Sequence, residues 1–457
     1  MPNTPWWKEL NRYHWFVFLM ASLAWLFDCL DQQLFIIARN FALSSLIPGD
    51  PVKAQEWGGY TTAIFVLGWA TGGLIFGAVG DRIGRAKTLT ITVLLYSVFT
   101  GLSALSRNEV DFSIYRFITG LGVGGVFGLA VALVADSLPD NARPHALGLL
   151  QSLSAVGNVT AGLIALTLGL WLASNPAGAK NSWRMLFLVG ALPAFLCVFI
   201  QIRLKEPERW VKARAEGRLT GAKFGSYTSL FGESRWRKPA LLGMLLCVSG
   251  VVGLWGVGFF SPELVGDVIG KALRAQKVPA DQIQGKRLMW TGITMVMQNI
   301  GAFLGMMTFT KAAHHFGRKP VFALTFVAAF LSTVAVFKYL SEPWHIFTLI
   351  PLMGFCQLAL FAGFAIYLPE LFPTRLRSTG TSFCYNVGRF IAASGPFTQG
   401  KLTAILARGA ETPDAKLEAF RTACAYVSGV FLLGLLALIF LPETKGRPLP
   451  EDIETGK

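Results

Sequence analysis

The sequence predicts an all-α membrane protein of twelve transmembrane helices arranged as two six-helix halves. The first observation is composition: of 457 residues, 53% are hydrophobic and 15% are charged, against about 25% charged in soluble domains. The second is the length of the apolar runs, since about 20 apolar residues cross a bilayer. The third is a loop pattern that occurs once in each half of the chain.

Twelve apolar runs long enough to span a membrane follow one another along the chain. The first six begin near Trp15, Gly58, Thr88, Phe112, Ala146 and Met185. The other six begin near Pro239, Leu288, Val321, Trp344, Thr379 and Ala423. A basic stretch separates the two groups, so we expect one bundle over 1–204, a linker over 205–238, and a second bundle with a short tail over 239–457.

Positive charge is concentrated in the loops on one side of the predicted membrane. The chain has 41 Lys and Arg against 26 Asp and Glu, and cytoplasmic loops hold the excess of Lys and Arg in membrane proteins. We therefore expect a multi-pass protein of the cell (inner) membrane with both termini in the cytoplasm, and no nucleic-acid partner. The basic linker is expected to lie on anionic lipid as an amphipathic tether.

The sequence contains no pattern typical of a metal site, a cofactor site or an enzyme. The six Cys residues lie within or at the ends of apolar runs, with no CxxC pair and no His at ligand spacing, which predicts packing residues. No nucleophile and base form a catalytic pattern. Residues 1–13 lead into the first apolar run without a small-residue cleavage site, so we expect no removable signal peptide.

Three loop patterns recur between the two halves at offsets of 233 to 235 residues. The pairs are Gly84-Arg85-Ala86-Lys87 with Gly317-Arg318-Lys319, Asp136-x-x-Pro139-x-x-x-Arg143 with Glu370-x-x-Pro373-x-x-x-Arg377, and Pro207-Glu208 with Pro442-Glu443. Such a constant offset predicts a duplicated six-span unit in parallel topology. The two units would be related by an axis along the membrane normal, with a pathway between them.

Two acids near the middle of the first span are the candidate proton-carrying residues. Asp28 and Asp31 are three residues apart, which places them on one side of a helix. A charged group at this depth costs roughly 2.5–3.5 kcal/mol, so it normally faces a cavity and has a function. Asp28 is the first candidate to load and release a proton, with Asp31 as its partner. The alternative is a pair that only bonds neighbouring helices together.

Two arginines within the predicted spans are candidates for binding an anion. Arg116 lies in the fourth span and Arg389 in the eleventh. A guanidinium stays charged at physiological pH and needs a carboxylate, either from the protein or from a substrate. Arg116 is as well explained by an ion pair with an aspartate of the first span. No acid in the eleventh span neutralises Arg389, which makes it the better anion-binding candidate.

Further polar residues within the spans are candidates either for the binding pocket or for hydrogen bonds between helices. Those assigned to the substrate are Gln298, Asn299, Gln357, Tyr385 and Asn386. Aromatic residues of the seventh and tenth spans would suit an aromatic or short apolar ligand body.

Several of these patterns resemble the major facilitator superfamily, and the resemblance covers nearly the whole chain. Gly77-Ala-Val-Gly-Asp81-Arg82-Ile-Gly84-Arg85-Ala-Lys87 is close to the superfamily's loop motif, and Arg116-x-x-x-Gly120-x-Gly122-x-Gly124 is similar to its fourth-span motif. Pro207-Glu208-Arg209 and Pro442-Glu443-Thr444 resemble the sugar-porter branch. Asp28-Cys-Leu-Asp31 and Arg389 are similar to the pattern of aromatic-acid and related carboxylate proton symporters. The first and seventh spans lack the Gly-Tyr-Asp and Gln-Gln-Leu patterns of sugar porters.

The resemblance implies a gate on the cytoplasmic side. Its expected residues are Asp81, Arg82, Arg85, Asp136, Arg143, Glu370 and Arg377. The carboxylate of Asp81 would meet a helix N-terminus of the other half and latch an outward-facing state. Two matching ion pairs are expected, Asp136 with Arg143 and Glu370 with Arg377.

His314 and His315 replace Asp81 and Arg82 in the second-half loop. A double His in a basic loop is usually a solvated surface feature, so we leave both residues out of the proton path.

The resemblance and the buried charges together predict a secondary transporter that alternates access between two six-helix bundles. Its partners would be protons and a small organic anion, an aromatic acid or another monocarboxylate, with the lipid bilayer around a monomer. The sequence leaves two alternatives open: a sugar or polyol proton symporter, and a membrane sensor of the same fold that binds without transporting.

Overall fold

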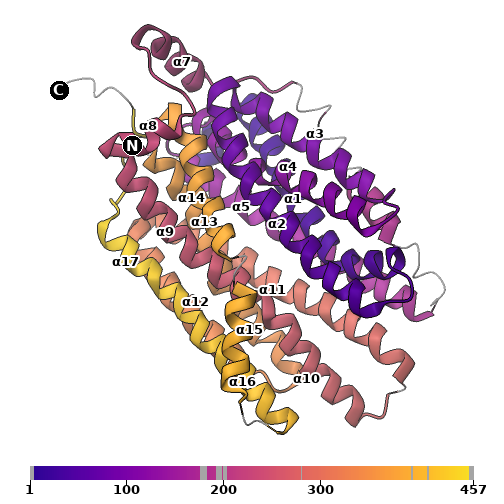
Figure 1. Cartoon of the computed structure of the whole chain (residues 1–457). Coiled ribbons are helices and arrows are strands. Elements are labelled where there is room, and N and C mark those ends of the chain that lie inside the picture. The colour runs from indigo at the N-terminus through magenta and orange to yellow at the C-terminus, as the bar shows by residue number, and fades with distance from the viewer. Residues whose placement is uncertain are drawn as a thin grey trace.

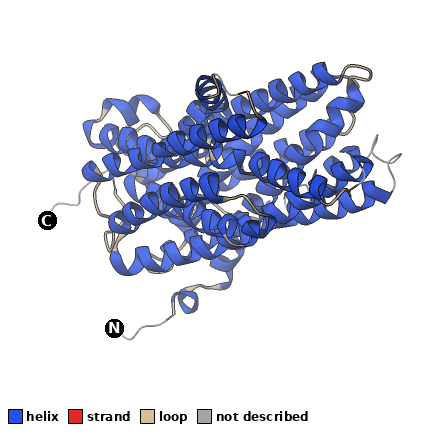
Figure 2. Ribbon diagram, turned by 90° about the horizontal axis from the view of Figure 1, so that it is seen from below, coloured by secondary structure: helices blue, strands red, loops and turns tan. Residues whose placement is uncertain are grey.

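The structure is a computed structural model, and every regular element in the part of the chain that it describes is a helix (Figures 1 and 2). The described residues are 5–174, 183–191, 198, 203–278, 280–392, 395–408 and 411–451. Ten helices in this part are long and apolar enough to cross a membrane.

The first half is built from long helices that follow the predicted runs. They are α1 (Arg12–Leu46), α2 (Pro51–Ile83), α3 (Arg85–Ser103), α4 (Glu109–Ser137) and α5 (Arg143–Ser174), after a short 3-10 helix η1 (Trp6–Glu9). Residues 183–191 are helical where the sixth span was expected, and most of the rest of that span lies outside the described residues.

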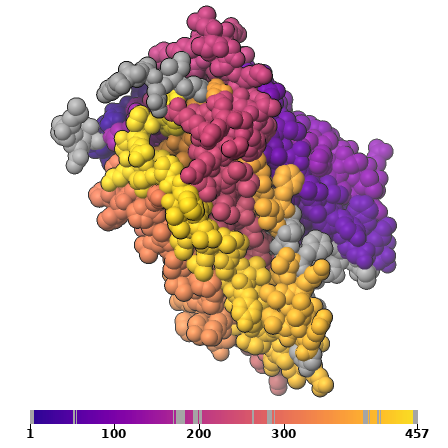
Figure 3. All heavy atoms as spheres, turned by 60° about the vertical axis from the view of Figure 1, so that its left-hand side comes forward, coloured from indigo at the N-terminus to yellow at the C-terminus, as the bar shows by residue number. Residues whose placement is uncertain are grey.

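The second half repeats this plan with more interruptions. Its helices are α9 (Ser234–Gly256), η3 (Gly258–Phe260), α10 (Ser261–Ala275), α11 (Ala280–Phe316), α12 (Arg318–Tyr339), η4 (Pro343–Phe347), α13 (Leu349–Tyr367), η5 (Leu368–Leu371), η6 (Thr374–Leu376), α14 (Arg377–Ala392), α15 (Gly395–Leu406), α16 (Pro413–Val427), η7 (Ser428–Leu432) and α17 (Leu433–Phe440). The predicted eleventh span falls on α14 and α15, and residues 393–394 between them lie outside the described residues. α14 is the more polar of the two because it carries two arginines, Arg377 and Arg389, besides Asn386 and several hydroxyl side chains. Figure 3 shows the yellow α16–α17 segment beside α9 on the outer face of this half.

Glycines with positive φ separate corresponding helices at one end of each half. Gly84, between α2 and α3, has φ +122°, and Gly317, between α11 and α12, has φ +99°. Residues with a side chain rarely adopt this conformation. A Cβ at either position would also meet a glutamate, Glu206 or Glu443 respectively. Both sharp turns therefore require glycine.

The fourth helix is the most buried of the first half. Gly120 and Gly124 of α4 lie directly against the backbone of α2, so a Cβ at either position would collide with α2. Small residues let membrane helices approach this closely, and van der Waals packing rather than the hydrophobic effect then holds them together. The close packing fixes α2 and α4 as one unit.

The two halves meet through α2 against α14 and α5 against α11. The connection between them, residues 203–233, includes α7 (Glu208–Thr220) and α8 (Tyr227–Gly232). It lies at the end of the bundle where Tyr13 and Lys205 are bonded to each other, and Figure 1 shows both chain ends there. We call this end the linker end.

The linker packs on the helix ends and does not lie only on the surface. The indole of Trp210 is buried and donates to the Asp81 carbonyl at 3.0 Å. The backbone of Gly225 donates to Arg375 at 3.1 Å and accepts from Arg82 at 3.2 Å. The linker therefore touches both halves and ties them together.

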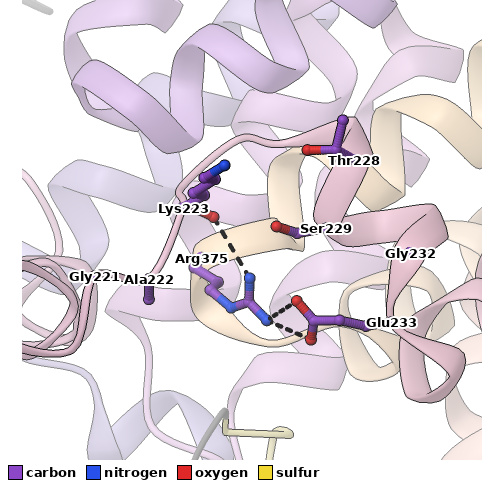
Figure 4. Close-up of a pocket in the computed structure, with 8 residues that line it drawn as sticks. All are labelled: Gly221, Ala222, Lys223, Thr228, Ser229, Gly232, Glu233 and Arg375. Atoms are coloured by element: carbon purple, nitrogen blue, oxygen red, sulfur yellow. Dashed lines mark hydrogen bonds and ion pairs between the residues drawn. The ribbon is translucent and has the colours of Figure 1, made fainter.

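A surface hollow of about 440 Å³ beside α8 contains one of these ties (Figure 4). There Arg375 makes a two-pronged ion pair with Glu233, with N···O distances of 2.9 and 2.7 Å, and reaches the Lys223 carbonyl at 3.5 Å. Arg375 lies in η6, just before α14. The hollow is thus part of the linker attachment.

Candidate functional site

A cavity of about 350 Å³ lies between the two halves, near the middle of the bundle. It is lined from both halves by α1, α2, α5, α9, α11, α13 and α14. Its side chains are mainly aromatic and amide groups, together with two arginines; they include Trp25, Gln32, Gln33, Arg39, Trp69, Trp255, Gln298, Asn299, Phe361, Tyr385 and Arg389. This composition is typical of a small-molecule site with a few orienting polar groups.

The two acids of the first span are in different surroundings. Asp28 accepts a hydrogen bond from the Gln32 amide at 3.0 Å, and its other oxygen is buried without a hydrogen-bond partner among the described residues. Asp31 accepts from Thr100 at 2.8 Å and lies 3.6 Å from the Arg116 guanidinium. Asp31 therefore has a fixed counter-charge, whereas the one hydrogen bond found for Asp28 among the described residues comes from a neutral amide.

The fourth-span arginine is held inside the first half and does not line the cavity. Besides Asp31, the Arg116 guanidinium donates to Ser103 at 3.0 Å and to Thr119 at 3.0 Å. It also lies over the Phe187 ring, 4.8 Å from its centroid. Of the two interpretations of Arg116, the structure matches the ion pair with an aspartate of the first span.

Arg389 lines the cavity, and no ion pair with a carboxylate is found for it among the described residues. Its guanidinium carbon lies 3.8 Å from the ring centroid of Trp69 and 4.4 Å from that of Tyr385. One nitrogen donates to the Asn386 side chain, and Nε is buried without a hydrogen-bond partner in the described part. Aromatic faces attract a cation without neutralising it. The positive charge of Arg389 thus stays available to an anion in the cavity.

The other predicted substrate residues fall into two groups. Gln298, Asn299 and Tyr385 line the cavity with Arg389. Asn386 instead supports Arg389, and Gln357 donates to Thr333 at 2.6 Å, toward α12. Neither Gln357 nor Asn386 is among the residues that line the cavity.

Arg39, Gln32 and Trp69 are cavity residues that the sequence interpretation missed. Arg39 lies at the far end of α1 from the linker and donates to Thr62 of α2. The signal was in the helical spacing, because residues 25, 29, 32, 36 and 39 repeat every three to four positions and share one face of α1. Trp69 had no such signal, since its role depends on a side chain from the other half.

At the linker end, Asp81 meets the N-terminus of α14. Its carboxylate accepts from the backbone N–H groups of Ser378 at 3.2 Å and Thr379 at 2.8 Å, and from the Thr379 hydroxyl at 2.7 Å. These N–H groups have no partner within their own helix, and the helix dipole favours a negative charge there. Arg85 contacts the same carboxylate at 3.2 Å. Arg82 does not join this contact and bonds the linker instead.

The ion pairs behind this contact differ from the two that we predicted. Asp136 lies between Arg85 and Arg377 and pairs with both; all three side chains are fully buried. The sequence predicted that Asp136 pairs with Arg143, and this prediction is wrong. The reason is that α4 ends against the first residues of α3 and α14, so the arginines that reach Asp136 are Arg85 of the same half and Arg377 of the opposite half.

The second predicted pair, Glu370 with Arg377, is also wrong. Glu370 pairs with Arg318 at 2.9 Å, within the second half. Arg143 pairs with Asp140, three residues before it. Partial burial raises the pKa of Asp140, but the positive charges of Arg143 and Arg209 outweigh this and hold it below its usual value.

A glutamate caps the helix after each of the two glycine turns. Glu206 accepts from the backbone N–H groups of Arg85 at 2.7 Å and Lys87 at 3.1 Å. Glu443 accepts from those of Arg318 and Lys319, both at 2.9 Å. Partial burial raises the pKa of Glu443, but these donors and those of residues 444 and 445 lower it below its usual value. In the first half the capping residue is thus Glu206, not Glu208 of the sequence repeat.

A family model for the Major Facilitator Superfamily matches residues 17–276 and 282–456. The chain is a member of the major facilitator superfamily. Its members at this level of similarity are transporters and not enzymes, and the predicted twelve-helix fold of two six-helix bundles is confirmed.

Two transporters and one solved structure are similar to this chain over most of its length. A probable 4-methylmuconolactone transporter of Cupriavidus pinatubonensis is 27% identical over 96% of this chain and 93% of its own length. The cis,cis-muconate transport protein of Acinetobacter baylyi is 28% identical over 86% of this chain and 89% of its own. The solved structure of the proton:xylose symporter XylE of E. coli has the same fold, with a TM-score of 0.69 at 20% identity over 96% of this chain and 98% of that one.

Proposed function

We propose that this transporter carries a small organic carboxylate into the cell together with a proton. The observation that supports this best is Arg389, a buried cation at the wall of the central cavity with aromatic faces and an amide as neighbours. A guanidinium binds a carboxylate through two parallel hydrogen bonds, so it is well suited to such a ligand. The names of two relatives, one for muconate and one for a muconolactone, are consistent with this choice.

In this proposal Asp28 carries the proton. Asp28 and Arg389 interact electrostatically across the boundary between the halves. An ionised Asp28 partly neutralises Arg389 and so competes with a substrate carboxylate. When Asp28 is protonated, this competition ends and Arg389 binds the substrate more strongly. Proton binding and anion binding therefore favour each other, which is the thermodynamic condition for symport.

The contacts at the linker end would then form the inner gate. The proposal takes the linker end as cytoplasmic and the protein as a monomer in the inner membrane. The bonds from Asp81 to α14 and from Asp136 to Arg377 cross between the halves and hold this end closed. Opening toward the cytoplasm requires both to break, and rocking of the bundles about the cavity would release proton and substrate together.

A sugar or polyol symporter is the second candidate. The amide side chains of Gln32, Gln33 and Gln298 at the cavity would suit hydroxyl groups. The guanidinium of Arg389, for which no ion pair with a carboxylate is found in the described part of the chain, is poorly matched to a neutral sugar, because a buried charge without a counter-charge is costly.

Uptake driven by an imposed pH gradient tests the choice between a carboxylate symporter and a sugar symporter. Proteoliposomes with an acidic exterior are offered labelled benzoate, cis,cis-muconate and xylose in separate assays. The proposal expects accumulation of a carboxylate, its loss in Asp28→Asn, and at least a tenfold higher KM in Arg389→Lys, in which the two-pronged contact is absent.

Carboxylate accumulation by Asp28→Asn at the wild-type rate would contradict the proton assignment. Accumulation of xylose and of no carboxylate would move the protein to the second candidate. The matched control is Arg274→Lys, because Arg274 is exposed and lies outside the cavity. This variant shows whether purification and reconstitution alone change uptake.

A further inference from the structure

Two adjoining surface hollows lie at the linker end, where α7 meets the turn between α2 and α3 (Figure 1). Each has a volume of about 440 Å³, and α7 supplies Arg214 and Arg218 to both. Arg82, at the end of α2, lines the first hollow, and Lys87, at the start of α3, lines the second. Four cations from three helices therefore surround one region of the surface, which we call the basic hollow.

No ion pair with a carboxylate is found for any of these four cations among the described residues. Arg82 donates to the Gly225 carbonyl at 3.2 Å, and Arg214 donates to the Arg82 carbonyl and lies 4.9 Å from a ring centroid of Trp210. These neutral partners position the two guanidiniums without neutralising them. Glu206 also lines the basic hollow, but its carboxylate accepts from the backbone at the start of α3. Four cations and one carboxylate leave a net charge of +3.

The outer face of α3 indicates where the membrane surface lies relative to the basic hollow. Ile91, Leu94 and Val98 follow Lys87 at steps of three or four residues, so they share its face of the helix. Their side chains are 46%, 40% and 40% exposed on a helix that is long and apolar enough to cross a membrane. Lys87 thus lies at the end of an apolar stripe, the position where basic side chains reach lipid headgroups.

We propose that the basic hollow binds the phosphate of an anionic phospholipid, whose acyl chains lie along the exposed face of α3. A phosphate accepts several charge-assisted hydrogen bonds, and arginine is well suited to donate them. Clusters of Lys and Arg next to a spanning helix attract anionic lipids for the same reason. A soluble phosphate could contact the same cations but would leave the apolar stripe of α3 without a partner.

The basic hollow is a second binding site, separate from the central cavity, and it does not depend on which substrate is carried. It also refines the expectation that the linker lies on anionic lipid, because it assigns the contact to particular side chains of α7.

A bound headgroup strengthens the attachment of α7 to the gate. Trp210 of α7 donates to the carbonyl of Asp81, whose carboxylate caps α14. One phosphate between Arg218 of α7 and Lys87 of α3 adds a bridge beside this contact. We therefore expect anionic lipid to stabilise the folded protein, since a ligand that binds only the folded state raises its stability.

Thermal unfolding of the full-length protein in a neutral detergent tests the site. Dioctanoyl phosphatidylglycerol is titrated, and dioctanoyl phosphatidylcholine and inorganic phosphate are the comparison probes. We expect phosphatidylglycerol to raise the unfolding temperature of the wild type by a few degrees, and the other two probes to leave it unchanged.

The decisive variants remove one positive charge each. Arg218→Gln and Lys87→Gln are each expected to raise the half-saturating concentration of phosphatidylglycerol about fivefold. The matched control is Lys212→Gln, because Lys212 is an exposed cation of α7 that lines neither hollow. At physiological salt its effect should stay below about twofold, since charges further from the phosphate are screened. The side chain of Arg218 is exposed, and no hydrogen bond is found for it among the described residues, so Arg218→Gln should fold normally.

Three results would overturn the inference. Equal stabilisation of the wild type by phosphatidylglycerol and phosphatidylcholine would show that the headgroup charge is not recognised. Equal shifts in Arg218→Gln and Lys212→Gln would show that the hollow is not the site. Stabilisation by inorganic phosphate at the same concentrations would make the ligand a soluble anion. Because no transport is measured, each of these results leaves the proposed function standing.

Discussion

The two halves close the linker end with different chemistry at equivalent positions. In the first half, the Asp81 carboxylate accepts two backbone N–H groups at the start of α14. The residue at the offset of 233 in the second half is His314, and its ring lies 4.7 Å from that of His145 near the start of α5. One half thus uses a charged cap on a helix N-terminus, and the other uses a contact between aromatic rings.

The histidine contact extends to the N-terminal segment. Trp6 of η1 stacks on His145 with ring centroids 5.6 Å apart, and His315 lies 6.0 Å from His314. Such ring contacts are worth roughly 0.5–1.5 kcal/mol each, less than charge-assisted hydrogen bonds at a buried helix end. The two halves therefore have the same backbone arrangement at the gate, but the contact of Asp81 with α14 is stronger than the contact of His314 with His145.

What both halves share is the capped glycine turn. Glu206 and Glu443 lie against Gly84 and Gly317 respectively, and each accepts from the backbone N–H groups of the two residues that follow its glycine. The glutamate caps, which both halves have, fix the turn within each half. The contacts that differ, Asp81 with α14 and His314 with His145, join one half to the other.

The largest expected effect is on the buried ion cluster of Asp136, Arg85 and Arg377, which joins the two halves. Asp136→Asn removes the counter-charge of both Arg85 and Arg377, and loss of a buried partner costs about 3–5 kcal/mol. Glu370→Gln removes the counter-charge of one arginine, Arg318, and is expected to cost about half as much. Thermal unfolding of both variants in detergent checks the order, and equal losses would mean that the two clusters are equivalent.

The second-largest expected effect distinguishes the contact of Asp81 with α14 from the contact of His314 with His145. Asp81→Asn keeps the shape but loses the charge at the N-terminus of α14 and beside Arg85, a loss of about 1.5–3 kcal/mol. We expect uptake to fall by roughly tenfold or more, and by less than twofold for His314→Asn. Initial uptake rates normalised to protein in the membrane provide the measurement. A larger loss in His314→Asn than in Asp81→Asn would reverse the comparison.

The two capping glutamates, Glu206 and Glu443, should contribute equally to stability. Glu206→Gln and Glu443→Gln are each expected to cost about 1 kcal/mol, and Glu208→Gln, two residues from the first cap, serves as the matched control with no expected cost. Because the pKa of Glu443 is lowered in the folded protein, its contribution is present above the unfolded pKa and is lost as the pH falls through the folded value. The stability of Glu443→Gln should therefore depend less on acidification than that of the wild type.

The smallest expected effect comes from a substitution that gives the second half the carboxylate that the first half has at Asp81. His314→Asp places a carboxylate near the start of α5, where the helix dipole stabilises it by about 0.3–1 kcal/mol. A second charged cap would favour the closed linker end. Cys29 lines the cavity, and its labelling by an impermeant maleimide from the linker end should slow in this variant. Faster labelling would show that the carboxylate does not act as a cap there.

The spans, the duplication and the intramembrane charges were predictable from the sequence because each is a local pattern. The ion pairs were not, since the partner of Asp136 depends on α4 ending against α14, a contact between residues 241 positions apart. The capping role of the glutamates was not predicted, and the repeat pairs Glu443 with Glu208, whereas the first-half cap is Glu206 on the other side of Pro207. Arg39 was missed because it lies near the end of the first span, where a cation is unremarkable without knowledge of the cavity.

The central claim is that an organic carboxylate and a proton move together. Proteoliposomes with a trapped pH dye and no initial pH gradient are given cis,cis-muconate, with Asp28→Asn liposomes as the control. The account predicts acidification of the lumen on addition of the carboxylate, absent in the variant. Entry of labelled carboxylate into wild-type liposomes without acidification would contradict it.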